Sequence, residues 1–141
     1  MNLYLDASAL VKRYIAENSS EEVNQWVGEA ELVVTSLITR VEVAAAITRA
    51  RRMKIIDPDE SDAAINQFRF EWESFLRLSI TENTVIRGDL LACEYNLRGF
   101  DATHLACALI WQESLGFPVA LATFDAQLVQ AAKALRIAVL P

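Results

Sequence analysis

The chain has 141 residues, a length typical of one compact domain, and we expect residues 1–141 to form a single domain. It is 53% hydrophobic with four Gly and three Pro, which allows a sizeable core and excludes a disordered chain. The formal net charge of −6 argues against a protein that binds nucleic acid by overall attraction, and no apolar run is long enough to span a membrane.

Segments with strand and helix patterns alternate along the chain. Short apolar runs predict five strands, at residues 3–5, 32–35, 76–80, 119–122 and 137–140. Helical spacing and helix-start residues predict helices over 7–16, 20–28, 36–54, 57–75, from 81 or 83 to about 99, 101–115 and 124–135. This alternation predicts a three-layer α/β/α domain of the α/β class, with a central parallel sheet of about five strands covered by helices on both faces.

Three aspartates lie where predicted strands end or helices begin. Asp6 ends the first strand, Asp125 closely follows the fourth strand, and Asp101 begins a helix after the loop around Gly99. Functional groups of open parallel sheets gather at the carboxyl ends of the strands, so all three can reach one edge. Aspartate is also a good helix cap, so each residue alone fits a structural role as well as a functional one.

Glu42 lies well inside the predicted helix 36–54, where a cap is impossible. Its neighbours one turn away, Ile38 and Ala46, are apolar, so the carboxylate lies beside the buried side of the helix. A carboxylate there is costly unless it is paired or bound to a metal, and a salt bridge to an arginine is the structural alternative. We predict that Glu42 joins the three aspartates in one catalytic site.

Four carboxylates that converge without an interleaved cation repel one another. They are stable together mainly with a divalent metal, or with some of them protonated. Oxygen ligands suit Mg²⁺ or Mn²⁺, which activates water and neutralises a phosphodiester transition state. We therefore predict that Asp6, Glu42, Asp101 and Asp125 bind metal. Ser8 either hydrogen-bonds Asp6 or a metal-bound water or caps the first helix, and Thr123 has similar alternatives.

Basic and aromatic groups elsewhere in the chain favour structural roles. A basic group ends the long third helix, and a solvated helix C-terminus is favoured there over a patch that contacts phosphate. Its members are Arg49, Arg51, Arg52 and Lys54. Phe68, Trp72 and Phe75 have helical spacing, which indicates core or subunit interface rather than a platform for stacking bases.

The histidine and the two cysteines favour structural roles over acid–base catalysis or zinc binding. His104 lies one turn after Asp101 on the same helix face, which would allow a general base, but we expect a packed, hydrogen-bonded side chain. Cys93 and Cys107 are expected to be reduced and buried, and zinc is improbable because these residues lack ligand-pair spacing. The N-terminus carries Asp6 where a signal peptide would be basic and then apolar, so we expect a cytoplasmic protein.

Four segments, in this order along the chain, resemble the PIN-domain family, and within it the VapC-type toxins of toxin–antitoxin pairs. They are YLDASALVKRY (Tyr4 to Tyr14), SLITRVEVAAAI (Ser36 to Ile47), LRGFDATHLACAL (Leu97 to Leu109) and ATFDAQLVQAA (Ala122 to Ala132). The resemblance spans nearly the whole chain.

The resemblance implies a magnesium-dependent endoribonuclease that cleaves RNA, acts as a homodimer and is blocked by a small antitoxin. The family's first to fourth acids match Asp6, Glu42, Asp101 and Asp125, in that order. Ser8 and Thr123 match hydroxyl positions near the metal. Because no acid is missing, the resemblance implies an active site rather than an inactive one.

Other functions remain as alternatives. The chain can be a stand-alone PIN-like nuclease or a catalytically silent PIN-like scaffold. A phospho-acceptor receiver domain needs a lysine after its last strand, whereas this chain ends in Leu140 and Pro141, and Lys133 is placed in a helix. A phosphatase of the haloacid-dehalogenase type needs a second Asp two residues after the first, where Ser8 stands.

Overall fold

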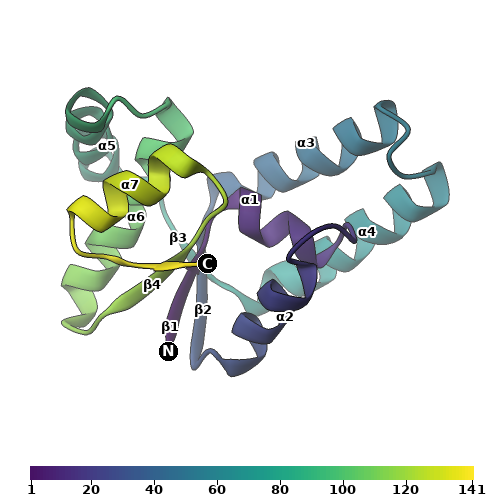
Figure 1. Cartoon of the computed structure of the whole chain (residues 1–141), viewed down its shortest axis with the longest axis horizontal. Coiled ribbons are helices and arrows are strands. Elements are labelled where there is room, and N and C mark those ends of the chain that lie inside the picture. Colours follow the sequence, from purple (N-terminus) through teal and green to yellow (C-terminus); the bar gives the residue numbers. More distant parts are fainter.

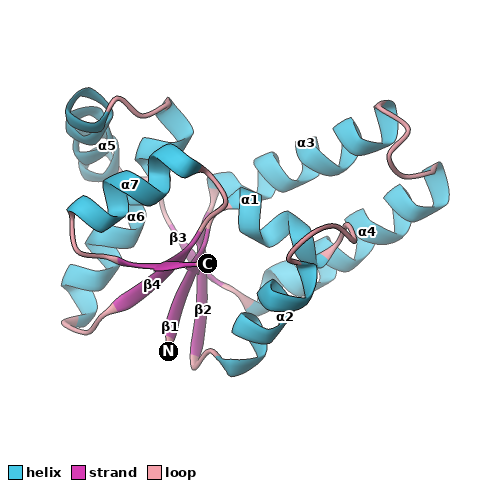
Figure 2. Cartoon of the chain, viewed as in Figure 1, coloured by secondary structure: helices cyan, strands magenta, loops and turns pink.

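The computed structural model describes residues 1–141 and contains one parallel sheet of five strands, as predicted (Figure 2). The strands are β1 (Asn2–Leu5), β2 (Leu32–Ser36), β3 (Leu76–Leu78), β4 (Val119–Ala122) and β5 (Ala138–Leu140). Their order in the sheet is β3-β2-β1-β4-β5, and every neighbouring pair is parallel. Receiver domains have the order 2-1-3-4-5, so this topology excludes that alternative.

Helices cover both faces of the sheet, which confirms the three-layer architecture. They are α1 (Ala7–Leu10), α2 (Ser20–Glu29), α3 (Ile38–Arg52), α4 (Pro58–Glu71), α5 (Glu82–Tyr95), α6 (Gly99–Leu115) and α7 (Ala126–Ala134), with short 3₁₀ turns at Val11–Arg13 and Trp72–Ser74. In Figure 1, α5, α6 and α7 lie on one side of the sheet, and α1 to α4 lie on the other.

The central strand β1 shows how the sheet divides the core. Tyr4 packs with the buried side chains of α6 and α7, whereas Leu3 and Leu5 pack with those of α1, α3 and α4. This follows from the two-residue period of a strand, which points successive side chains to opposite faces. Because all three side chains are completely buried, β1 is anchored from both sides and holds the residue after it, Asp6, in a defined place.

Two helix starts form as the sequence indicated. Asp57 caps α4, with its side chain accepting a hydrogen bond from the Glu60 N–H and the Glu60 side chain accepting one from the Asp57 N–H. Thr81, rather than Asn83, caps α5 in the same reciprocal way with Thr84. Each such cap satisfies backbone donors that the helix itself leaves free, so both helix starts are defined locally.

Several predicted boundaries are wrong by a few residues. The helix predicted over 7–16 ends at Leu10 and continues only as a 3₁₀ turn, and the strand predicted over 76–80 ends at Leu78. The last helix starts at Ala126 rather than at Phe124, because Asp125 is its cap. Helix α2 does start at residue 20 as predicted, with Ser19 as its cap residue, but the Ser19 side chain makes no capping hydrogen bond. These are fraying positions, where the local pattern is weakest.

Helices α3 and α4 form a two-helix arm that projects from the sheet (Figure 1). The basic group Arg49, Arg51, Arg52 and Lys54 lies at the outer end of this arm and is exposed. Arg51 is within 3.7 Å of Asp62 on α4, the kind of surface ion pair that contributes little to stability. Seven residues of helix, about 10 Å of rise, separate Arg49 from Glu42, which supports the solvated role favoured by the sequence.

The aromatic residues expected in the core or at an interface are all in the core. Phe68, Trp72 and Phe75 are each less than a tenth exposed, and they pack beneath the arm with Leu3 and Leu5. They are therefore not available for the subunit interface that the sequence allowed.

The two thiols differ: Cys107 is buried as expected, but Cys93 is exposed, because it lies on the outer side of α5. None of the helices combines the length and the hydropathy that a membrane-spanning segment needs.

Candidate active site

The sheet order places a crevice between β1 and β4. The chain passes from β1 outward to β2 and β3 on one side, and β4 and β5 lie on the other side. In open α/β sheets, ligands bind outside the carboxyl ends of the strands at such a point of reversal. Leu5 is paired with Ala122, so Asp6 and Thr123 leave the two strands side by side. The Asp6 N–H donates to the Ala122 carbonyl over 3.2 Å, which extends the strand pairing to the first acid.

The Asp6 carboxylate is buried and held by three donors. Its Oδ1 accepts from the Ala9 N–H at 2.9 Å and from the Ser8 hydroxyl at 2.7 Å, and its Oδ2 accepts from the Thr123 hydroxyl at 2.5 Å. Asp6 is thus the cap of α1 and a candidate site residue at the same time. Burial raises the pKa of Asp6, although its hydrogen-bond donors and the nearby His104 act in the opposite direction.

Ser8 and Thr123 join the ends of the two strands through their hydroxyl groups. The Ser8 Oγ donates to Asp6 and accepts from the Phe124 N–H at 2.9 Å. The Thr123 Oγ1 donates to Asp6 and accepts from the Asp125 N–H at 3.2 Å. Each hydroxyl therefore links the residue after β1 to the backbone after β4, which orients the carboxylate of Asp6. Of the alternatives for Ser8, the structure shows the hydrogen bond to Asp6.

Asp101 and Asp125 are bridged by an arginine that the sequence analysis missed. The Arg98 Nε donates to Asp101 Oδ2 at 3.1 Å, and its Nη2 donates to Asp125 Oδ2 at 2.9 Å. Asp125 caps α7 through its other oxygen, which accepts from the Leu128 N–H. Asp101 is not a cap: α6 begins at Gly99, so Asp101 lies in the first turn with its carboxylate toward Arg98. The expectation that no cation separates the acids is therefore wrong.

Glu42 is held by a buried histidine rather than by an arginine. Its Oε1 lies 2.6 Å from His104 Nε2, and His104 Nδ1 lies 2.8 Å from the Tyr4 hydroxyl. Burial raises the pKa of Tyr4, which keeps its hydroxyl protonated and able to donate to Nδ1. Since the Glu42 carboxylate only accepts, Nε2 is the donor to it. His104 is 1% exposed, as expected for a packed histidine, and with both nitrogens engaged it has no access to substrate as a general base.

All four predicted acids line one pocket of about 230 Å³. Its walls are Asp6, Ala7, Ser8, Glu42, Arg98, Asp101, His104, Phe124 and Asp125. Burial raises the pKa of Asp101, and repulsion by Asp125 and Asp6 adds to this, whereas Arg98 opposes it. Asp101 is therefore close enough to Asp125 and Asp6 for their negative charges to repel its own. The structure thus brings Asp6, Glu42, Asp101 and Asp125 together, with Ser8 in the same wall and Thr123 directly behind Asp6.

The donor chemistry of this pocket fits a divalent cation. It offers hard carboxylate oxygens with an excess of negative charge, which Mg²⁺ and Mn²⁺ prefer. As the side chains stand, no three Asp, Glu, His or Cys groups are close enough together to hold one ion. The reason is visible in the contacts, because Asp101 and Asp125 are turned to Arg98 and the Asp6 oxygens face their own donors. An ion at this site would replace Arg98 as their counter-charge.

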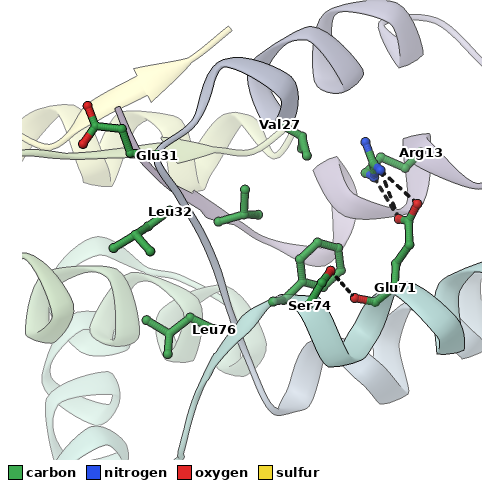
Figure 3. A pocket seen from close by; sticks show the side chains of 9 residues that line it. Arg13, Val27, Glu31, Leu32, Glu71, Ser74 and Leu76 are labelled. Atoms are coloured by element: carbon green, nitrogen blue, oxygen red, sulfur yellow. Dashed lines mark hydrogen bonds and ion pairs between the residues drawn. The ribbon is translucent and has the colours of Figure 1, made fainter.

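A second hollow, of about 370 Å³, lies at the opposite end of the sheet, near the amino ends of β2 and β3 (Figure 3). Its charged side chains are Arg13, Glu31 and Glu71, and the Arg13 guanidinium forms hydrogen bonds to both Glu71 oxygens. Glu71 also accepts from the Tyr14 hydroxyl at 2.8 Å. Arg13 and Glu71 balance each other, and Glu31 pairs with the N-terminal ammonium at 3.4 Å, so the hollow has the character of a structural ion-pair site rather than of a catalytic site.

Two site features escaped the sequence analysis for different reasons. Arg98 stands three residues before Asp101, and that spacing on a helix start was a visible signal. Its second contact, to Asp125, crosses from α6 to α7 and has no local signal. The Tyr4–His104–Glu42 chain joins three separate elements, so spacing alone could not predict it.

Comparison with known proteins identifies similar chains. Residues 3–134 match the family model described as "PIN domain". Ribonuclease VapC46 of Mycobacterium tuberculosis is 31% identical over 138 residues, which cover 98% of this chain and 95% of that one. Ribonuclease VapC3 of Pyrobaculum aerophilum is 28% identical over 132 residues, covering 92% and 94%. A toxin–antitoxin complex from Klebsiella pneumoniae contains a chain with the same fold, with a TM-score of 0.64 at 19% identity, covering 89% of this chain and 87% of that one.

Proposed function

The chain belongs to the PIN-domain family, and on that premise we propose that it is a metal-dependent endoribonuclease, the toxin of a toxin–antitoxin pair. The observation that carries the proposal is the convergence of four acids, from four separate elements, on one pocket at the carboxyl edge of the sheet. Relatives that match over nearly their whole length are named ribonucleases, which supports RNA as the substrate. Because the proposed substrate is RNA, which is found in the cytoplasm, we propose that the protein acts there.

We assign the metal to the four carboxylates. Asp6, Asp101 and Asp125, with Glu42, would hold Mg²⁺ or Mn²⁺. When bound, such an ion supplies an activated water and neutralises charge on the phosphodiester. The protein's own part is orientation. Ser8 and Thr123 hold the Asp6 carboxylate, which keeps it from rotating as substrate enters. Such supporting contacts typically change metal affinity or activity by about 10- to 100-fold.

His104 acts in this proposal as a positioning residue. It is fixed by Tyr4 from one side and donates to Glu42 from the other, so it selects one orientation of that carboxylate. The Glu42 side chain is 20% exposed, which leaves it accessible from the pocket while its other side is held. Because this buried donor is already oriented before the reaction, no free energy is spent on orienting it during the reaction.

The direct test is cleavage of RNA by the purified protein. We expect a fluorescent single-stranded RNA to be cut in Mg²⁺ or Mn²⁺ and left intact in EDTA. The Asp6→Asn variant, prepared in the same way, controls for contaminating nucleases. Cleavage in EDTA would refute metal dependence. If the parent protein does not cut RNA in either metal while it is folded, the catalytically silent scaffold becomes the better interpretation.

An antitoxin partner follows from the same pocket. Arg98 already shows that a guanidinium fits between Asp101 and Asp125. The pocket retains two more acids, so it suits a cationic segment from a partner, which satisfies carboxylates in bidentate fashion. The solved complex from Klebsiella pneumoniae is named as a toxin with its antitoxin, which supports such a partner here. We propose a small antitoxin that places an Arg or Lys in the pocket and excludes the metal.

Co-expression with a small gene next to this one tests the antitoxin, and the absence of such a gene would count against the toxin assignment. Its product should bind, inhibit RNA cleavage by the parent and compete with Mg²⁺, and its binding, measured directly, should weaken in Glu42→Gln or Asp101→Asn. A product that binds but leaves cleavage unaffected would favour a stand-alone PIN nuclease.

The homodimer is likewise a proposal, which light scattering at micromolar concentration tests. Its interface must use surfaces other than Phe68, Trp72 and Phe75, since these are buried in the single chain.

A further inference from the structure

A third hollow, distinct from the one near Arg13 and Glu71, opens beside the acid pocket and shares a wall with it. It measures about 410 Å³, a size within the range of small-ligand sites, and is lined by Glu42, Arg98, Gly99, Phe100 and Asp101. Glu42, Arg98 and Asp101 also line the acid pocket, so the two spaces adjoin along these side chains. If the phosphodiester bond that is cleaved lies in the acid pocket, the neighbouring nucleotide of the same RNA strand can occupy this hollow.

Phe100 is an exposed aromatic ring at this position. It is 57% exposed, although it lies in the first turn of α6, whose later residues are mostly buried. Apart from its chain neighbours and its own helix backbone, Gly99 has no atom within 4 Å of where a Cβ would stand, so no other part of the chain fills this side of the hollow. An exposed aromatic ring in a polar hollow contributes little to folding. It is, however, the kind of surface on which single-stranded nucleic acids stack their bases.

Arg98 is the only arginine or lysine in the lining of either space. In a chain of net charge −6, RNA phosphates approach four carboxylates and need a local cation. The Arg98 side chain is 75% exposed, and exposed ion pairs hold their partners weakly. A phosphate can therefore compete for the guanidinium, whose fork of N–H donors matches phosphate oxygens.

We propose that this hollow is a nucleotide subsite, in which Phe100 stacks on a base of the RNA strand and Arg98 binds the adjacent phosphate. The inference rests on the proposed ribonuclease function and extends it to the substrate contacts next to the cleaved bond. Stacking on an aromatic side chain accepts any base, so the subsite supplies affinity rather than base selection.

The structure offers a matched control for each residue. Phe117 follows the other end of α6 and is 66% exposed, but it lines neither space. Arg87 on α5 pairs with Glu113 on α6, so Arg87→Gln removes the same charge as Arg98→Gln at a distance from the acids. All four side chains are exposed or paired at the surface, which means that the variants should fold.

The test measures RNA binding by fluorescence anisotropy, with every variant also carrying Asp6→Asn so that the RNA is not cut. The probes are a single-stranded RNA of about ten nucleotides and an abasic ribose–phosphate strand of the same length. Phe100→Ala should weaken binding of the ordinary RNA about tenfold and leave the abasic strand unaffected. Arg98→Gln should weaken binding of both and lower the slope of log affinity against log salt by roughly 0.7, as for one lost phosphate contact.

Three results would overturn the subsite. The first is that Phe100→Ala and Arg98→Gln bind both probes as Phe117→Ala and Arg87→Gln do. The second is that Phe100→Ala weakens both probes and also halves the molar mass in light scattering, which assigns the ring to a subunit interface. The third is that the parent neither binds nor cuts RNA, which refutes the proposed function and the subsite with it. A parent that cuts RNA with unaffected variants refutes the subsite alone.

Discussion

Two clusters of arginine and carboxylate lie at opposite ends of the same sheet, and they differ in charge balance. At the amino end, one Arg13 meets one Glu71, both about four-fifths buried, and Tyr14 completes the hydrogen bonds. At the carboxyl end, one largely exposed Arg98 meets Asp101 and Asp125, with Asp6 and Glu42 in the same pocket. In a balanced cluster each charge has a partner, so removing one partner destabilises the fold, whereas an excess of acid itself costs stability.

The direction of the pKa shifts separates the two clusters further. Burial, together with the contact to Glu71, raises the pKa of Tyr14, so this group titrates only in strongly alkaline solution. Burial also raises the pKa of Asp6 and of Asp101, so the folded protein holds these two protons more tightly than the unfolded chain does. The carboxyl edge therefore carries an ionisation cost at neutral pH that the amino edge does not, and such perturbed groups are typical of functional sites.

The largest expected effect is on catalysis, from acid-to-amide substitution in the acid pocket. Asp6→Asn and Asp101→Asn should each lower RNA cleavage by at least about 100-fold, because each removes an anionic metal ligand. Their thermal stability without metal should hold or rise, since repulsion is relieved. Cleavage rates in Mg²⁺ test the predicted loss of activity, and the Tm in EDTA tests the predicted stability without metal. Parent-like cleavage by both variants would disprove the mechanism.

The same chemical change at the other end should have the opposite outcome. Glu71→Gln leaves Arg13 and Tyr14 without their ionised acceptor, which should cost about 2 kcal/mol, or a fall in Tm of roughly 6 °C for a domain of this size. Cleavage at a temperature where both proteins are folded should be unchanged. Glu113→Gln, which breaks the exposed pair with Arg87, is the control and should change the Tm much less. A Glu71→Gln protein that loses activity but keeps its Tm would reverse the roles assigned to the two clusters.

The smallest expected effect is a pH dependence of stability. Because the pKa of Asp101 is raised above its ordinary value of 3.8 in the folded protein, the folded state binds this proton more tightly than the unfolded state does. Stability is therefore lost as the pH rises through the raised pKa and regained as it falls. Asp101→Asn cannot ionise, so in EDTA it should be more stable than the parent at pH 7, with a difference that shrinks toward pH 4.

Urea unfolding at several pH values checks this trend. Tyr14→Phe is the matched control, because the raised pKa of Tyr14 acts only in alkaline solution and its effect should be constant between pH 4 and 7. A stability difference between Asp101→Asn and the parent that grows as the pH falls would show that Arg98 outweighs burial and repulsion at Asp101.

The sequence by itself determined the α/β alternation, the parallel sheet and the place of the acids at strand ends. These depend on local rules: a two-residue period in strands, helical spacing, and caps such as Asp57 and Thr81 that define a helix start from residues three positions away. The positions of Asp6 and Asp125 could be predicted for the same reason, since each follows a strand and caps the next helix.

Only the tertiary structure decided which charges meet. Tyr4 lies 100 residues from His104, and His104 lies 62 from Glu42, so their contact exists only once α3 and α6 are packed against β1. The link from Arg98 to Asp125 likewise requires α6 and α7 to start at the same edge of the sheet. Local spacing specifies neighbours within about one helical turn, whereas side chains from different elements are brought together by packing, which leaves no periodic trace in the sequence.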